Sequence, residues 1–129
     1  MAKLSDFHTY HIGCVITLGN KVLAAGWNTE RGHPLQHEYN RYRGFNDDVG
    51  KLHAEIMALL QIRHLSLPWR RLEVYIWRTT KDGRRALARP CKACERALKD
   101  AGIEKIYYTV RDGFAFENIG MLYNIRKEA

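Results

Sequence analysis

The first apolar segment of the chain is short and rich in β-branched residues. Residues 12–18 (Ile-Gly-Cys-Val-Ile-Thr-Leu) predict a β-strand, and the Gly19-Asn20 dipeptide that follows them is a turn signal. Residues 21–26 then predict the returning strand. The pattern therefore indicates a β-hairpin that ends at Trp27-Asn28.

The next stretch, residues 29–51, is polar and contains several Gly, His and Asn residues. It predicts a long loop with a helical turn near Gln36–Tyr42, and a loop of this length in a small domain is usually functional or mobile. Beyond the loop, apolar residues recur at the spacing of an amphipathic helix over residues 52–65. Pro68 ends this helix.

The second half of the chain shows the same signals. Leu72–Thr79 predicts a strand, Asp82-Gly83 predicts a hairpin turn, and Arg84–Ala88 predicts the returning strand. A last strand is predicted at Ile103–Val110. Pro90 suits the first turn of an intervening helix, and Gly102 suits its C-terminal end. The tail from Phe114 is ambiguous, and a short helix is expected near its end.

The order hairpin, helix, strand, helix, strand favours a mixed sheet with helices packed on it. We therefore expect an α/β fold, a three-layer α/β/α sandwich with a mixed central sheet of about five strands. The 129 residues suit one domain that spans residues 1–129.

Net charge and cysteine content indicate the kind of partner, the cellular location and the chemistry to expect. The formal net charge of +7 favours an anionic partner, although a solvated basic surface explains it equally well. No stretch approaches the ~20 apolar residues of a membrane span, and residues 1–6 lack the apolar run of a secretion signal. We therefore expect a cytoplasmic protein with no membrane partner. Three cysteines, two of them spaced as Cys-x-x-Cys, favour metal or redox chemistry over a disulfide framework.

Two short motifs open the two predicted helices. Cys91 and Cys94 share one face of a first helical turn, where the positive end of the helix favours the thiolates that bind metal. His53 can supply a third ligand, and sulfur with imidazole is a set that zinc prefers. Three protein ligands leave a fourth position for water, as in catalytic zinc sites.

Glu55 follows His53 by two residues and can reach the same pocket without being a ligand. Zinc lowers the pKa of bound water to roughly 7, and a nearby carboxylate can take that proton. Together, His-x-Glu and Cys-x-x-Cys form the signature of zinc deaminases. The alternatives are a thioredoxin-like redox pair, or a structural zinc whose fourth ligand is a distant residue such as His33, His37 or Cys14.

These motifs carry a family resemblance. From Ile12 to about Val110 the chain resembles the cytidine/deoxycytidylate deaminase-like superfamily of zinc-dependent deaminases. Residues 53–59 are also similar to the zinc motif of bacterial tRNA adenosine deaminases. Residues 88–91 and the short N-terminus are similar to small, often phage-borne members.

The resemblance implies roles that the residues alone do not establish. It implies that Asn28 hydrogen-bonds the substrate sugar, that the backbone at Ala54 and Cys91 meets the base, and that the protein is a homo-oligomer. The chain also departs from the family. Eleven residues precede Ile12 where members have a full helix, and Ala88 stands where polynucleotide cytosine deaminases carry Trp.

Three arginines, Arg84, Arg85 and Arg89, lead towards the second motif. A guanidinium binds phosphate well, and Arg89 is the preferred candidate because it adjoins Pro90. Solvated hairpin residues are the alternative for Arg84 and Arg85.

The sequence thus predicts a zinc-dependent hydrolase that deaminates a cytosine nucleoside or nucleotide of the deoxycytidylate type. The predicted catalytic residue is Glu55, and the predicted zinc ligands are His53, Cys91 and Cys94. The predicted substrate-binding residues are Asn28, Ala54 and Arg89. One alternative is a deaminase of cytosine or adenine in single-stranded DNA or RNA. Another is a non-catalytic, zinc-stabilised binding module.

Overall fold

A computed structural model describes residues 10–30, 32–43 and 52–121 of the chain. Its strands form one sheet and are β1 (Tyr10–Leu18), β2 (Lys21–Trp27), β3 (Glu73–Thr80), β4 (Arg85–Ala86), β5 (Lys105–Val110) and β6 (Gly113–Asn118). The strand order is β2-β1-β3-β5-β6, and β4 pairs with β3. The β3–β5 pair is parallel and the other pairs are antiparallel, so the predicted mixed sheet is confirmed.

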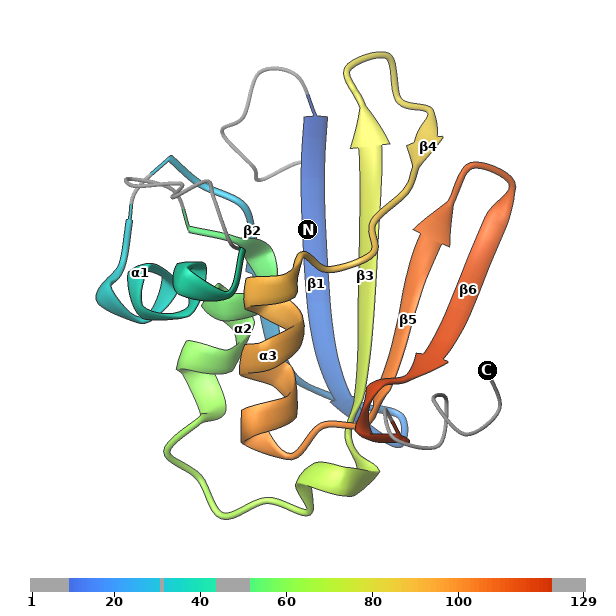
Figure 1. The fold of residues 1–129 in the computed structure, drawn as a ribbon. Coiled ribbons are helices and arrows are strands. Elements are labelled where there is room, and N and C mark those ends of the chain that lie inside the picture. Colours follow the sequence, from blue (N-terminus) through green and yellow to red (C-terminus); the bar gives the residue numbers. More distant parts are fainter. Residues whose placement is uncertain (1–9, 31, 44–51, 122–129) are drawn as a thin grey trace.

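Three α-helices, α1 (Pro34–Asn40), α2 (Ala54–Ile62) and α3 (Lys92–Ala101), pack on one side of this sheet (Figure 1). The sheet residues that face them are apolar and form the core, including Cys14, Ile16, Val74, Ile76 and Ile106. In the described part of the chain the other face of the sheet carries no α-helix. The sheet and the three helices therefore form two layers of the predicted three-layer sandwich. Among the described residues, no helix is long and apolar enough to cross a membrane.

Helix α3 shows how the sequence specifies an element of this fold. Its buried residues, Ala93, Cys94, Ala97 and Leu98, form one stripe, while charged residues cover the rest of the helix. Gly102 ends the helix in the left-handed conformation, with φ of 103°, which glycine adopts without steric cost. Because α3 connects the parallel strands β3 and β5, its first turn lies near the end of β3.

The tail differs from the sequence prediction. Phe114 and Phe116 belong to β6, which pairs antiparallel with β5, so the sheet has six strands where about five were expected. Asp112-Gly113 at this turn is a hairpin signal of the same kind as Asp82-Gly83, and the sequence prediction overlooked it. A short 3-10 turn follows at Ile119–Met121. The short helix expected near the end of the tail lies outside the described residues.

The long loop between β2 and α2 contains more structure than a single helical turn. It holds α1, which follows His33 and begins at Pro34, and a 3-10 turn at Arg41–Arg43. The His33 ring accepts a hydrogen bond from the Leu35 backbone, and proline suits the first turn of a helix. Residues 44–51 lie outside the described part of the chain.

Candidate metal centre and active site

The three residues proposed as metal ligands meet where α2 and α3 begin. His53 directly precedes α2, and Cys91 directly precedes α3. The Nδ1 atom of His53 lies 3.6 Å from the Sγ of Cys91 and 3.3 Å from the Sγ of Cys94. All three potential ligand atoms lie within 4.8 Å of one another, a separation that one bound ion can bridge.

The chemistry of this donor set fits zinc. The pKa of Cys91 is lowered to about 4, first by a hydrogen bond from the Cys94 thiol and also by His53, whereas burial raises the pKa of Cys94. The pair therefore holds a thiolate next to an imidazole nitrogen, which are ligands that zinc prefers.

The alternative fourth ligands do not join this group within the described residues. Cys14 is fully buried in the core, where burial raises the pKa of its thiol. The Nδ1 atom of His33 accepts a hydrogen bond at the start of α1. A group of three ligands leaves room for water, as a catalytic zinc site requires.

Glu55 lies in the first turn of α2, two residues after His53. Its side chain is buried, with 5% of the residue exposed. Burial raises its pKa to about 7, while the nearby His53 acts in the opposite direction. A carboxyl group with this pKa can both accept and release a proton near neutral pH.

Thr29, which follows Asn28, forms a β-bridge with Leu52, which precedes His53. Asn28 therefore lies beside His53. Its Oδ1 accepts a hydrogen bond from the Ile12 backbone at 3.0 Å. Its Nδ2 is buried, and no described residue provides that atom with a hydrogen-bond partner. A buried donor of this kind is rare unless it meets a ligand or a water molecule.

Ala54, the first residue of α2, is fully buried and packs beneath β2. A Cβ on Gly26 would lie 2.3 Å from the carbonyl oxygen of Ala54, so glycine is what allows this approach. Ala54 can offer a substrate its backbone alone, and its predicted role stays a prediction.

Arg89 is held by acidic side chains. Its guanidinium binds both carboxylate oxygens of Glu117, at 2.7 and 3.1 Å, and also lies 3.0 Å from Glu95. These partners raise the pKa of Arg89, with Glu117 contributing most. The arrangement gives Arg89 a structural role between β6 and α3, and its binding of phosphate stays a prediction.

Sequence reasoning missed one buried contact of the metal motif. Gln36 on α1 accepts a hydrogen bond from the backbone N–H of His53 at 2.9 Å. The two residues are separated by a polar loop without periodic pattern, so no local signal could have paired them.

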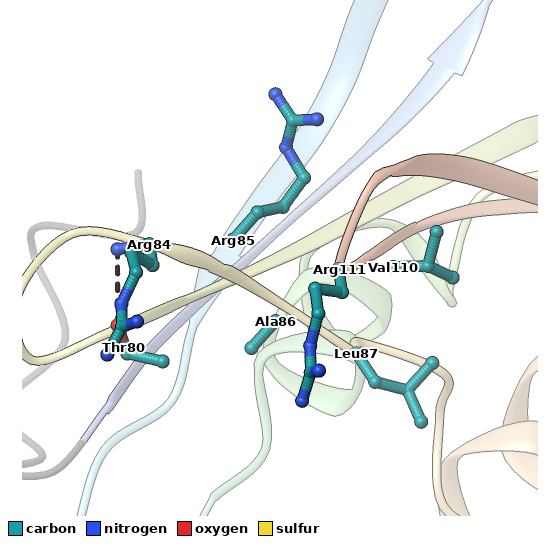
Figure 2. Close-up of a pocket in the computed structure, with 7 residues that line it drawn as sticks. All are labelled: Thr80, Arg84, Arg85, Ala86, Leu87, Val110 and Arg111. Carbon is teal, nitrogen blue, oxygen red and sulfur yellow. Dashed lines mark hydrogen bonds between the residues drawn. The ribbon is translucent and has the colours of Figure 1, made fainter.

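An arginine-lined cavity of about 630 Å³ lies where β3 and β5 end. Arg84, Arg85 and Arg111 line it, and Figure 2 shows Arg85 pointing away from Arg111. The Arg84 guanidinium pairs with Asp82 at 3.0 Å, and that of Arg85 lies 5.3 Å from the centre of the Phe114 ring. Within the described residues no ion pair engages Arg111, so the cavity has a net positive lining.

A mixed sheet with a His–Cys–Cys group at the starts of two helices defines an α/β domain of the cytidine deaminase-like class. The particular family follows from the sequence. The family described as the cytidine and deoxycytidylate deaminase zinc-binding region matches residues 1–110, most of the chain. The protein therefore belongs to this family, as the resemblance implied. A comparison with curated proteins gave no match.

Solved structures share the fold. A cytidine deaminase from Burkholderia pseudomallei is 12% identical, with a TM-score of 0.61, covering 94% of this chain and 86% of that one. A dCMP deaminase from the cyanophage S-TIM5 is 24% identical, with a TM-score of 0.50, covering 76% of this chain. The match spans 64% of the length of the cyanophage protein.

Proposed function

We propose that this protein is a zinc-dependent hydrolase that removes the amino group of a cytosine nucleotide of the deoxycytidylate type. The observation that carries the proposal is the position of Glu55, a buried carboxyl group with a pKa of about 7, beside His53, Cys91 and Cys94. A structural metal site has no need of a proton carrier at this place. A cytoplasmic location and a homo-oligomeric state remain predictions from the sequence.

His53, Cys91 and Cys94 would hold the zinc ion, and the chemistry that zinc supplies when bound is a water acidic enough to lose a proton near neutral pH. Glu55 accepts that proton on its carboxylate. It delivers this proton to the ring nitrogen N3, then takes the second proton of the water from the oxygen now bound to C4 and delivers it to the departing amino group. One water is consumed, the C4–N bond breaks, C4 gains the oxygen, and ammonia leaves.

The substrate class rests on the family and on Asn28. The family includes deaminases of cytidine and deoxycytidylate, and the similar cyanophage protein is a dCMP deaminase. The Nδ2 of Asn28, next to His53, is a donor suited to a sugar hydroxyl. These features favour a nucleotide with its sugar over a free base.

The test is to incubate zinc-loaded protein with deoxycytidylate and measure ammonia and the uracil product. We expect Glu55→Gln to keep its zinc and to lose activity by ~10²–10⁴-fold, because general acid–base groups contribute about that much. Glu38→Gln, on the exposed face of α1, is the matched control and should keep full activity. Unchanged turnover in zinc-loaded Glu55→Gln would overturn the mechanism.

A second candidate substrate is single-stranded DNA or RNA, favoured by the arginine-lined cavity and the net charge of +7. Leu87 lines the cavity and is four residues before Cys91, so their Cα atoms are at most about 14 Å apart. This reach suits a nucleotide that flanks the target base. Contacts to flanking nucleotides set substrate choice in polynucleotide deaminases.

Salt dependence separates the two candidates. For a single strand, the logarithm of the binding constant should fall with the logarithm of the salt concentration, with a slope of about −0.7 for each phosphate contact. The binding constant of one nucleotide should change only slightly with salt. Replacing Arg84 and Arg111 by Gln should reduce the slope for an oligonucleotide. Arg71→Gln, before the start of β3 at the other end of the sheet, should leave it unchanged. An unaltered slope in the double variant would exclude this cavity as the strand-binding site.

A further inference from the structure

Gln36 is a buried amide on α1 whose two polar atoms are both engaged. The residue is 1% exposed. Its Oε1 accepts the backbone N–H of His53 at 2.9 Å, and its Nε2 donates to the Oδ1 of Asn40 at 2.7 Å. Asn40, one helical turn later, is also buried. The amide of Gln36 is therefore held from one side by α1 while it binds the residue that begins α2.

The carbonyl oxygen of His53 accepts the backbone N–H of Met57 in α2 at 3.0 Å, while the N–H of His53 is the group that Gln36 binds. His53 has an extended conformation, with φ of −79° and ψ of 152°, and its side chain makes no capping hydrogen bond to α2. The preceding residue, Leu52, is tied to Thr29 by two backbone hydrogen bonds of 2.9 and 3.0 Å. Gln36 thus fixes the peptide that lies between this bridge and the first turn of α2.

Helix α1 also contacts the helix that carries the two cysteines. The hydroxyl of Tyr39 donates to Asp100 on α3 at 2.8 Å. The Arg96 guanidinium, also on α3, lies 5.1 Å from the centre of the ring of Tyr42, which belongs to the 3-10 turn that directly follows α1. Because α1 is attached to α3 as well as to His53, it can set the distance between the imidazole and the two sulfurs.

We propose that Gln36 is a positioning residue that fixes the place of His53 relative to Cys91 and Cys94. This inference rests on the metal site of the proposed function. Groups that orient metal ligands typically change metal affinity or activity by 10–100-fold when they are removed. A role limited to satisfying a buried N–H would lower stability without altering the metal site.

Gln61 offers a matched control on the same helix that His53 precedes. Its amide bonds both backbone groups of Ala25, accepting from the N–H at 3.1 Å and donating to the carbonyl oxygen. It therefore ties α2 to β2 much as Gln36 ties α2 to α1. Gln61 lies near the other end of α2, away from His53. Replacing Gln61 removes a helix anchor but leaves the metal motif untouched.

The experiment compares Gln36→Leu, Gln36→Glu and Gln61→Leu in the full chain. Zinc affinity is measured by competition with a chromophoric chelator, ligand geometry by the absorption spectrum of the cobalt(II) form, and stability by thermal unfolding. We expect Gln36→Leu to weaken zinc binding 10–100-fold and to change the cobalt spectrum. Gln36→Glu, which keeps an acceptor oxygen for His53, should recover most of the affinity. Gln61→Leu should lower stability alone.

Zinc affinity of Gln36→Leu within twofold of the wild type, with the same cobalt spectrum, would overturn the proposal. If Gln36→Leu does not fold, Gln36→Asn provides the test, because its shorter side chain withdraws the acceptor and keeps the amide. No readout requires a substrate. A wild-type protein that binds zinc but deaminates no nucleotide would refute the proposed function and leave this comparison valid. A wild-type protein that binds no zinc would refute both.

Discussion

Gly26 and Ala54 stand in backbone contact, since a Cβ on Gly26 would lie 2.3 Å from the carbonyl oxygen of Ala54. The same Cβ would lie 2.8 Å from the backbone nitrogen of Ala58, so the neighbours on α2 are backbone atoms that cannot rotate away. Strand β2 therefore packs directly on the start of α2. This packing holds the first turn that carries Glu55.

Gly26→Ala should displace α2 from β2. We expect a loss of ~1–3 kcal/mol in the free energy of unfolding, as overpacked cores show, together with weaker zinc binding. Denaturant unfolding and metal analysis would measure both effects. Gly113→Ala is the control, because a Cβ there meets nothing within 4 Å. Equal stability of the two variants would contradict the close packing of α2 on β2.

The three cysteines should differ in their effect on metal content. Cys91→Ser and Cys94→Ser remove members of the His–Cys–Cys group and should abolish stoichiometric zinc. Cys14→Ala removes a buried thiol outside that group and should keep one zinc per chain. Zinc at a concentration 100 times its Kd should stabilise the wild type by about 2.7 kcal/mol, a gain that chelation removes. A Cys14→Ala protein without zinc would indicate a different ligand set.

Asn28→Asp should reveal a substrate contact. The variant keeps an oxygen that can accept from Ile12, but it replaces the unpartnered Nδ2 donor by an acceptor. We expect KM for the nucleotide to rise about tenfold or more, since a lost hydrogen bond of ~1.5 kcal/mol corresponds to that factor. Steady-state kinetics with zinc-saturated enzyme would measure the rise. An unchanged KM would remove Asn28 from the binding site.

The ion pair of Glu117 with Arg89 should make stability depend on pH. Arg89 lowers the pKa of Glu117, so the stabilisation is present above the ordinary glutamate pKa of about 4.3 and is lost as the pH falls through the lower folded value. The pair is partly exposed, so we expect at most about 1 kcal/mol. The stability difference between wild type and Glu117→Gln should be largest near pH 7 and should vanish in acid. A constant difference across pH would contradict this role for the ion pair.

Local signals in the sequence account for much of the site. The spacing of Cys91 and Cys94 and the glycine at 102 are features of one helix, so they could be interpreted without the rest of the fold. His53 and Glu55 open a second helix, and the family resemblance connected the two motifs. Each of these residues was predicted because its partner lies within one or two helical turns or within a known motif.

The contacts that were missed join distant parts of the chain. Gln36 meets His53 across a polar loop, and Arg89 meets Glu117 on a strand that the sequence did not predict. A neighbour in sequence, such as Pro90, indicates where a side chain starts but not where a long guanidinium ends. Such pairings depend on the packing of separate elements, and a single sequence carries no pattern for them.

The pairing of β1 with β3 has a consequence for how the site is assembled. His53 and Glu55 belong to the half of the chain that follows β1, whereas both cysteines belong to the half that follows β3. An antiparallel ladder that runs from Tyr10 opposite Thr80 to Thr17 opposite Glu73 joins these halves. Neither half holds all three potential ligands, so binding of an ion by this group would require that the two halves have paired in register. The metal content of a preparation would therefore measure the fraction of molecules in which β1 and β3 are correctly paired.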